Sequence, residues 1–279
     1  MKKTLITAIL LSFVVFVSCS GKKEEVKSSN RVIIAYVGGY KGLVDVDKMS
    51  ANKITHINYA FVDVKEGKAF LTNEATDTVN FRKLNELKQQ NPELKILISI
   101  GGWSWSKNFS DAVLTSEGQK IFAKSAVDIM SKYNLDGVDI DWEYPAIPGD
   151  EGNIYRPEDT KNYTLMFAAI RAELDALSKT TDKKYLLTTA VGGFQNFIDN
   201  TEMDKAQEYL DYVNLMTYDS QSNETAIHHT NLYPSESYTI GNSASNAVDG
   251  FIKAGVPAEK LVMGIAFYGR AYQLKKGEP

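Results

Sequence analysis

The sequence contains few cysteine and histidine residues: one and three, respectively, among 279. A single cysteine excludes an intrachain disulfide and a CxxC metal site, and so few histidines make a zinc enzyme a poor fit. Basic residues are not in excess either, because 31 Lys and Arg stand against 35 Asp and Glu, for a formal net charge of -4. That balance argues against a protein held to nucleic acid by charge. We therefore expect no metal, no other cofactor and no nucleic-acid partner.

The N-terminal apolar run, residues 5–17, is too short to span a bilayer. It follows Lys2 and Lys3 and precedes small residues, which is the pattern of a signal peptide. Residues 16–19 read Phe-Val-Ser-Cys and resemble a bacterial lipobox, with Phe where Leu is usual, so Cys19 is expected to carry a lipid. The alternative is an ordinary secretory signal with an incidental cysteine. The first interpretation predicts a lipoprotein of the bacterial outer membrane or cell surface, which contacts the membrane only through its lipid.

The rest of the chain is expected to form a flexible tether and one globular domain. Residues 1–18 are assigned to the lipoprotein-type signal peptide, and residues 19–30 are charged and polar without an apolar period, as in a tether. Apolar residues make up 43% of the chain, enough to build a core. Residues 31–279 show no internal repeat and no second composition block, so they are expected to form a single catalytic domain.

Short strand-like runs alternate with helical segments from residue 31 onward. The predicted strands are 32–37, 54–64, 95–102, 137–144, 185–193, 212–219 and 261–272. The predicted helices are 78–90, 116–133, 158–178, 203–210 and 244–254. This alternation predicts an α/β fold in which crossover helices join parallel strands. Seven strands suit a (β/α)8 TIM barrel that lacks its last unit.

The predicted barrel is incomplete. Only seven residues follow residue 272, whereas a crossover to another parallel strand needs about a dozen or more. An eighth strand is therefore expected to be absent, as in a truncated gene, and the first and seventh strands would be left unpaired, which favours aggregation. The alternative is a natural seven-stranded or doubly wound sheet.

Three acidic residues, Asp139, Asp141 and Glu143, alternate along the predicted strand 137–144. Side chains of a strand alternate between its faces, so the acids share one face and the apolar residues between them share the other. Acids about 7 Å apart in a low-dielectric interior raise one another's pKa, which keeps a carboxylic acid protonated near neutral pH. Glu143 lies nearest the carboxyl end of the strand, where barrel active sites form, so it is the candidate general acid.

Two other interpretations of the acids fit less well. An EF-hand calcium loop counted from Asp139 needs glycine at its sixth position, where this sequence has Tyr144. A purely structural row of buried acids is costly without a function.

Four motifs occur in a fixed order along the chain. They are Ser99-Ile100-Gly101-Gly102-Trp103, the DGxDxDxE pattern at residues 136–143, Met216-Thr217-Tyr218-Asp219, and Gly255-Val256-Pro257 followed by Phe267-Tyr268-Gly269-Arg270. With them, residues 31–272 resemble glycoside hydrolase family 18, the chitinases and their relatives. The resemblance implies retaining hydrolysis of β-1,4-linked N-acetylglucosamine polymers, in which the acetamide of the substrate is the nucleophile. The implied partner is an N-acetylglucosamine-containing polysaccharide or glycan.

The resemblance also implies roles for individual residues. Glu143 would protonate the leaving oxygen, Asp141 would stabilise the oxazolinium intermediate, Asp139 would hold the charge state of Asp141, and Tyr218 would orient the acetamide. The implied substrate-binding residues are Tyr36, Phe61, Gly102, Trp103, Tyr144, Met216, Asp219, Tyr268 and Arg270. The adjacent residues at 228 and 229, both histidines, are expected to be solvated in a loop.

The sequence departs from the family pattern in two places. No tryptophan follows Trp142, although the eighth strand of the family normally supplies one, and residues 220–224 lack the aromatic residues that many chitinases have there. Two alternatives to a chitinase therefore stay open. One is an endo-β-N-acetylglucosaminidase that acts on N-glycans, and the other is a non-catalytic carbohydrate-binding remnant.

Overall fold

The computed structural model describes residues 31–220, 226–236 and 242–274. The chain divides into the units Met1–Arg31 and Val32–Pro279, and the description that follows concerns the second. The predicted signal peptide, the tether and the lipidation residue Cys19 lie outside the described residues. Within the described residues, no helix is both long enough and apolar enough to cross a membrane.

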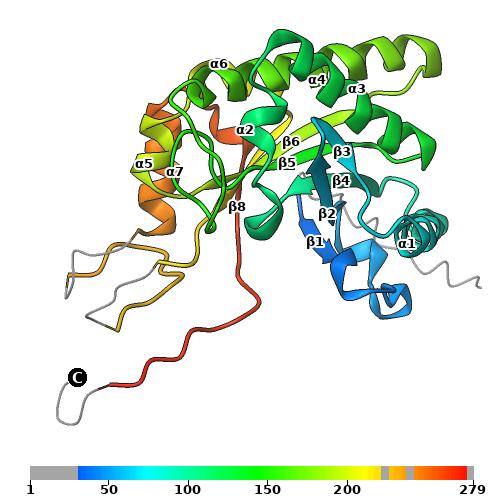
Figure 1. Ribbon diagram of the computed structural model, residues 1–279. Helices are drawn as coiled ribbons and strands as arrows, with labels where there is room; N and C mark the ends of the chain where they lie inside the picture. The colour runs from blue at the N-terminus through cyan, green and yellow to red at the C-terminus, as the bar shows by residue number, and fades with distance from the viewer. Residues whose placement is uncertain (1–30, 221–225, 237–241, 275–279) are drawn as a thin grey trace, which may run out of the picture. The chain divides into compact units, whose positions relative to one another are not determined.

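Seven parallel strands form one curled sheet in the order β1-β2-β4-β5-β6-β7-β8, with helices on its outer side (Figure 1). The strands are β1 Ile34–Gly38, β2 His56–Lys65, β4 Lys95–Gly101, β5 Gly137–Asp141, β6 Leu186–Gly192, β7 Tyr212–Met216 and β8 Leu261–Met263. A short strand, β3 (Lys68–Phe70), pairs antiparallel with the end of β2 and was not predicted. The predicted α/β fold of parallel strands is confirmed.

Seven helices lie among the described residues; five were predicted, with shifts at their ends, and two short ones, 109–112 and 195–199, were not. They are α1 Glu74–Glu86, α2 Phe109–Ala112, α3 Ser116–Lys132, α4 Asp159–Thr181, α5 Gln195–Asp199, α6 Met203–Ala206 and α7 Ala244–Lys253. Single 3-10 turns are η1 Gly39–Lys41, η2 Val46–Lys48, η3 Ala51–Lys53, η4 Leu87–Gln89, η5 Trp103–Trp105, η6 Gln207–Tyr209 and η7 Ala258–Lys260. Side-chain caps fix several first turns: the Thr115 hydroxyl accepts from the Gly118 N–H at the start of α3 (3.0 Å).

Three predicted strands are too long at their carboxyl ends. β5 ends at Asp141, β7 at Met216 and β8 at Met263. Beside β5, Gly102 adopts a φ of +81°, which takes the neighbouring chain out of extended geometry, and its N–H donates to the Asp141 carbonyl (2.7 Å). Parallel pairing therefore stops there, and Glu143 lies in a loop rather than on the strand.

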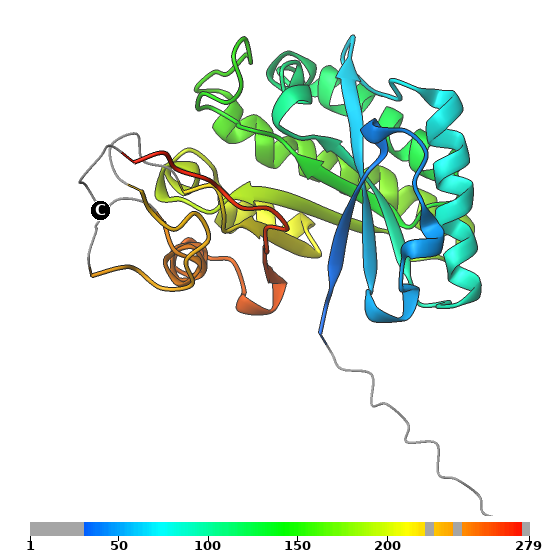
Figure 2. The same ribbon diagram turned by 90° about the horizontal axis from the view of Figure 1, so that it is seen from below.

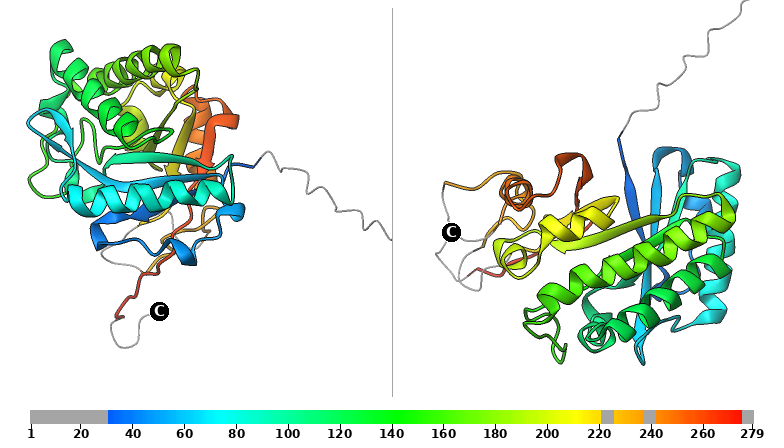
Figure 3. Two further views of the ribbon diagram at one scale, coloured as in Figure 1. Left: turned by 90° about the vertical axis from the view of Figure 1, so that its right-hand side faces the viewer. Right: turned by 90° about the horizontal axis from the view of Figure 1, so that it is seen from above.

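The core lies between the sheet and its helices. Val138, Ile140 and Trp142 are each at most 1% exposed. The Trp142 ring stacks on Phe109 of α2, with centroids 5.1 Å apart, and meets Tyr163 of α4 edge-on at 6.0 Å. Figure 3 shows α3 and α4 side by side over the outer face of the sheet. The prediction that the apolar face of the acid-bearing strand packs against helices is confirmed.

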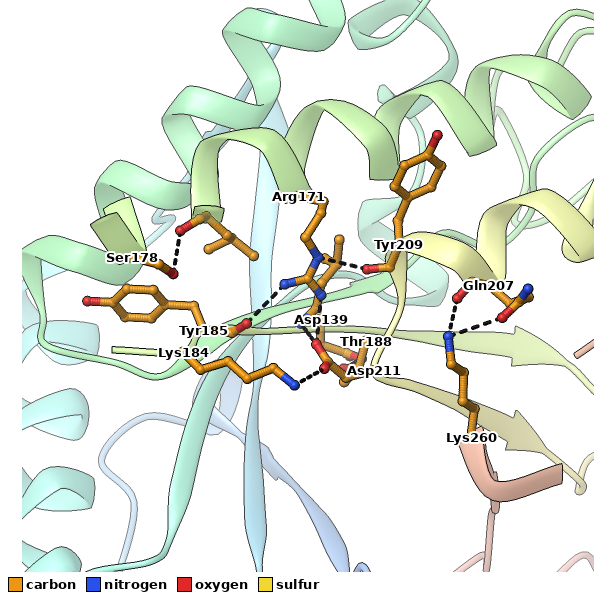
Figure 4. A network of polar contacts seen from close by, with 12 residues as sticks. Asp139, Arg171, Ser178, Lys184, Tyr185, Thr188, Gln207, Tyr209, Asp211 and Lys260 are labelled. Atoms are coloured by element: carbon orange, nitrogen blue, oxygen red, sulfur yellow. Dashed lines mark hydrogen bonds and ion pairs between the residues drawn. The ribbon is translucent and has the colours of Figure 1, made fainter. Parts of the chain in front are cut away.

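A polar network joins the amino ends of β6 and β7 to α4 (Figure 4). The Arg171 guanidinium donates to the carbonyls of Tyr185 (3.0 Å) and Tyr209 (2.9 Å) and pairs with Asp211 (2.7 Å). Asp211 also accepts from the backbone N–H of Leu187 (2.9 Å). These contacts fix the register at the end of the sheet opposite the acids.

The sheet is open between β1 and β8. Within the described residues, β1 pairs only with β2 and β8 only with β7, and Figure 2 shows blue β1 at one edge. A cavity of about 430 Å³ is lined by residues from both edge strands. Apolar side chains there are left partly exposed, including Ile33 at 48% and Met263 at 45%. This opening agrees with the expected incomplete barrel.

Candidate active site

The three acids were predicted on one strand, but only two of them lie on β5 and the third lies just beyond its carboxyl end. Asp139 and Asp141 are on β5, and Glu143 follows in the loop; their exposed fractions are 0%, 5% and 9%. The alternation of side chains along a strand therefore explains the positions of Asp139 and Asp141 but not that of Glu143. Contacts within the loops determine the position of Glu143.

Asp139 is fully hydrogen-bonded inside the sheet. It accepts from the hydroxyls of Tyr36 (3.0 Å), Ser99 (2.7 Å) and Thr188 (2.5 Å) and from the Asn214 amide (3.3 Å). Asn214 also donates to the Tyr36 hydroxyl (3.0 Å). Four strands thus converge on one carboxylate. Tyr36, predicted to contact substrate, directs its hydroxyl to this acid.

Asp141 and Glu143 interact through their charges. Burial raises the pKa of Asp141 well above its usual range, and the negative charges of Glu143 and Asp139 raise it further. The Oδ1 atom of Asp141 is buried and, among the described residues, has no hydrogen-bond partner. Burial likewise raises the pKa of Glu143 to about 7, and the charges of Asp219 and Asp150 act in the same direction. Glu143 can therefore carry a proton near neutral pH.

A cavity of about 100 Å³ opens beside Glu143 at the carboxyl ends of β5, β6 and β7. Five predicted site residues line it: Glu143, Tyr144, Met216, Tyr218 and Asp219. The lining residues that sequence analysis missed are Gly192, Gly193, Phe194, Thr217, Ser220, Asn242 and Ser243. Most of these lie in loops, and Thr217 alone falls within a motif, where the sequence analysis gave it no role. Active sites of barrels and ligand sites of open α/β sheets form at this same end of the strands.

Other predicted aromatic residues lie outside this cavity. Trp103 is 48% exposed and meets the Tyr144 ring edge-on, with centroids 6.3 Å apart. The Phe61 ring covers the α-carbon of Gly102, where a β-carbon would lie 2.6 Å from it, and stacks on Tyr40 at 6.3 Å. Tyr40 was not predicted. Together these rings form an aromatic surface that extends the site toward β2.

Asp219 holds the segment that follows β8. It accepts from the Tyr268 hydroxyl and from the Arg270 guanidinium, whose Nε lies 3.0 Å from Oδ1. Tyr268 and Arg270 were predicted on a strand, but they lie in irregular chain beyond it because β8, in the part of the chain that the structure describes, has no second neighbour to continue its pairing. The prediction that they lie at the site does not depend on that strand.

His229 does not fit the expectation of a solvated loop residue. Its side chain is 11% exposed, its Nδ1 lies 3.9 Å from Asp219, and its ring stacks on Tyr268 at 5.5 Å. His228 is exposed, as expected. The loop that carries His229 folds back over Asp219. No local sequence signal indicates this fold of the loop.

The donor set of the site does not form a metal centre. Among the described residues, no group of three or more His, Cys, Asp or Glu is arranged to hold a metal ion. The hydrogen bonds of Asp139 come from hydroxyl and amide groups, which suit a carboxylate that is held in place by the protein.

Comparison with known proteins agrees with the motifs and the geometry. Residues 24–279 match the model of glycosyl hydrolases family 18. The chain is 38% identical to Chitinase A1 of Niallia circulans, over 85% of this chain and 41% of that protein, and 34% identical to Chitinase 1 of Aphanocladium album, over 82% and 58%. It spans about half the length of these relatives.

Comparison with a solved structure shows that the fold is similar as well. A family 18 N-acetylglucosaminidase from Paenibacillus barengoltzii superposes with a TM-score of 0.77 at 40% identity, covering 85% of this chain and 68% of that one. The motifs, the row of acids and these similarities agree, and the chain belongs to glycoside hydrolase family 18.

Proposed function

We propose that the protein hydrolyses β-1,4-linked N-acetylglucosamine polymers, chitin or chito-oligosaccharides, with retention and with Glu143 as the general acid. The observation that carries the proposal is the position of Glu143: it is buried, lines a cavity and has a pKa of about 7. A carboxylic acid with such a pKa can donate a proton at neutral pH. The chitinase names of the relatives support the choice of substrate.

The proposed reaction has two steps. The Glu143 carboxyl gives its proton to the glycosidic oxygen while the acetamide oxygen of the substrate attacks the anomeric carbon, so that the glycosidic bond breaks and an oxazolinium ion forms. The Glu143 carboxylate then takes a proton from a water molecule. The oxygen of that water attacks the anomeric carbon from the face opposite the acetamide oxygen, and the oxazolinium ring opens. Asp141 stabilises the positive charge, and Tyr218, which also lines the cavity, orients the acetamide.

The raised pKa of Glu143 predicts how activity depends on pH. Only the protonated acid can start the reaction, and a raised pKa means that this form persists up to pH of about 7. The value of kcat/KM, which reports the free enzyme, is expected to fall about tenfold per pH unit above that point. A pH profile on a soluble oligosaccharide measures this, and a profile that stays level to pH 9 would contradict it.

Substrate choice tests the proposal directly. We expect cleavage of soluble chito-oligosaccharides and of chitin, weak cleavage of analogues without the 2-acetamide, and retention of the anomeric configuration by NMR. A high-mannose glycopeptide serves as the rival substrate. Release of product from the glycopeptide alone would identify an endo-β-N-acetylglucosaminidase, and binding without hydrolysis of either substrate would identify a carbohydrate-binding protein.

A further inference from the structure

The backbone of Glu143 is fixed by two side chains rather than by strand pairing, because β5 ends at Asp141. We propose that Ser106 is a positioning residue that sets the orientation of Glu143, with Asn153 as its counterpart on the other side. This inference rests on the proposed function, since it assigns Glu143 the role of general acid. Neither residue belongs to the motifs in the sequence.

Ser106 joins the loop after β4 to the chain on both sides of Trp142. It is 0% exposed, and its Oγ accepts from the N–H of Glu143 at 2.8 Å. The same hydroxyl lies 2.8 Å from the Gly102 carbonyl and 3.2 Å from the Asp141 carbonyl, to which it donates its one proton as a shared hydrogen bond. One buried hydroxyl thus satisfies the donor of Glu143 and two acceptors.

The carbonyl of Glu143 is held by residues farther along its own loop, between β5 and α4. The Asn153 amide donates to it at 2.9 Å. Gly149 packs against the same atom so closely that a β-carbon there would lie 2.0 Å from the oxygen. Both polar backbone groups of Glu143 therefore bind side chains, one from the loop after β4 and one from its own loop, and the peptide units on either side of Glu143 have little freedom to rotate.

Removal of the Ser106 hydroxyl would leave the N–H of Glu143 buried and unpaired. The peptide would shift to find water, since an unsatisfied buried donor is costly. Such a shift moves the carboxyl out of line with the glycosidic oxygen and exposes it to water. Because burial is what raises the pKa of Glu143, greater hydration lowers that pKa toward its ordinary value.

The chain offers a matched control in Ser125 on α3. Its Oγ also accepts from a backbone N–H, that of Ala69 (2.9 Å), and donates to a backbone carbonyl, that of Phe122 (2.7 Å), but it lies away from the acids. We expect Ser106→Ala to lower kcat by ~10- to 100-fold, as for a misplaced catalytic group, with KM changed less than about threefold. Its kcat/KM profile should decline at a lower pH than that of the wild type. Ser125→Ala should have the kcat and the pH profile of the wild type. Asn153→Ala should show the same loss of kcat and the same shift of the pH profile as Ser106→Ala.

A second measurement keeps the inference testable if no substrate is cleaved. The carboxyl carbon of Glu143 is titrated by NMR in the full chain, in the wild type and in both serine variants. A lower midpoint in Ser106→Ala alone supports the positioning role even where hydrolysis fails and the proposed function is wrong. An unchanged midpoint and kcat in Ser106→Ala, or equal losses in the two serine variants, would overturn it.

Discussion

The Glu143→Gln variant is expected to lose turnover on chito-oligosaccharides by ~10²- to 10⁴-fold, the effect typical of losing a positioned general acid. Glutamine matches glutamate in shape but cannot donate an acid proton, so the cavity beside it should keep its form. The backbone contacts with Ser106 and Asn153 do not involve the side chain and should persist. Oligosaccharide affinity, measured by calorimetry, is therefore expected to change little.

The matched control for this variant is Glu151→Gln. Glu151 lies in the same loop but is exposed, so its loss should leave both kcat and affinity as in the wild type. Wild-type turnover by Glu143→Gln would refute the role of the acid. Loss of affinity together with turnover would assign Glu143 to substrate binding.

The Trp142→Ala variant is expected to be the most destabilising single change considered. Trp142 is 1% exposed and fills the space between the sheet, Phe109 and Tyr163. Truncation of such a residue removes buried area and leaves a cavity, which costs about 3–5 kcal/mol of the free energy of unfolding. Urea denaturation followed by circular dichroism measures this loss.

Trp103→Ala is the natural comparison, because it removes the same ring from the surface. Trp103 is 48% exposed and contacts Tyr144 at its edge. We expect its free energy of unfolding to change by less than about 1 kcal/mol, as for most surface changes, while oligosaccharide affinity falls. A loss of stability equal to that of Trp142→Ala would mean that Trp103 is packed as tightly as Trp142, contrary to their exposed fractions of 48% and 1%.

The sequence predicts the order of strands and helices well, because periodicity reports which face is buried. It predicts strand ends poorly. Pairing depends on the neighbouring strand, and β5 stops where Gly102 turns its neighbour out of extended geometry. β8 ends at Met263, since its second neighbour is absent from the described residues. β3 contains only three residues and was below the length that a periodic pattern can detect.

The residues of the site likewise fall into two groups: those in motifs could be predicted, and those in loops could not. Residues in the motifs, such as Asp139, Asp141 and Tyr218, could be found because residue type and spacing identify them. Ser106 and His229 could not, since a loop serine or histidine acquires its contacts only when the chain folds back. Their positions follow from tertiary packing and leave no pattern along the chain.

The open edge of the sheet also bears on the site. The cavity between β1 and β8 and the cavity beside Glu143 share Met216 and Tyr218 in their linings. Tyr36 of β1 is 40% exposed although its hydroxyl binds Asp139. The hydrogen bonds that hold Asp139 therefore link the edge strand β1 to β5.

We propose that burial keeps Glu143 protonated near neutral pH beside an open cavity. An NMR titration of carboxyl carbons, with the Glu143 resonance assigned by its loss in Glu143→Gln, tests this claim directly. We expect a midpoint of about 7 that coincides with the decline of kcat/KM. A midpoint near 4.5, the ordinary value for glutamate, would contradict the account.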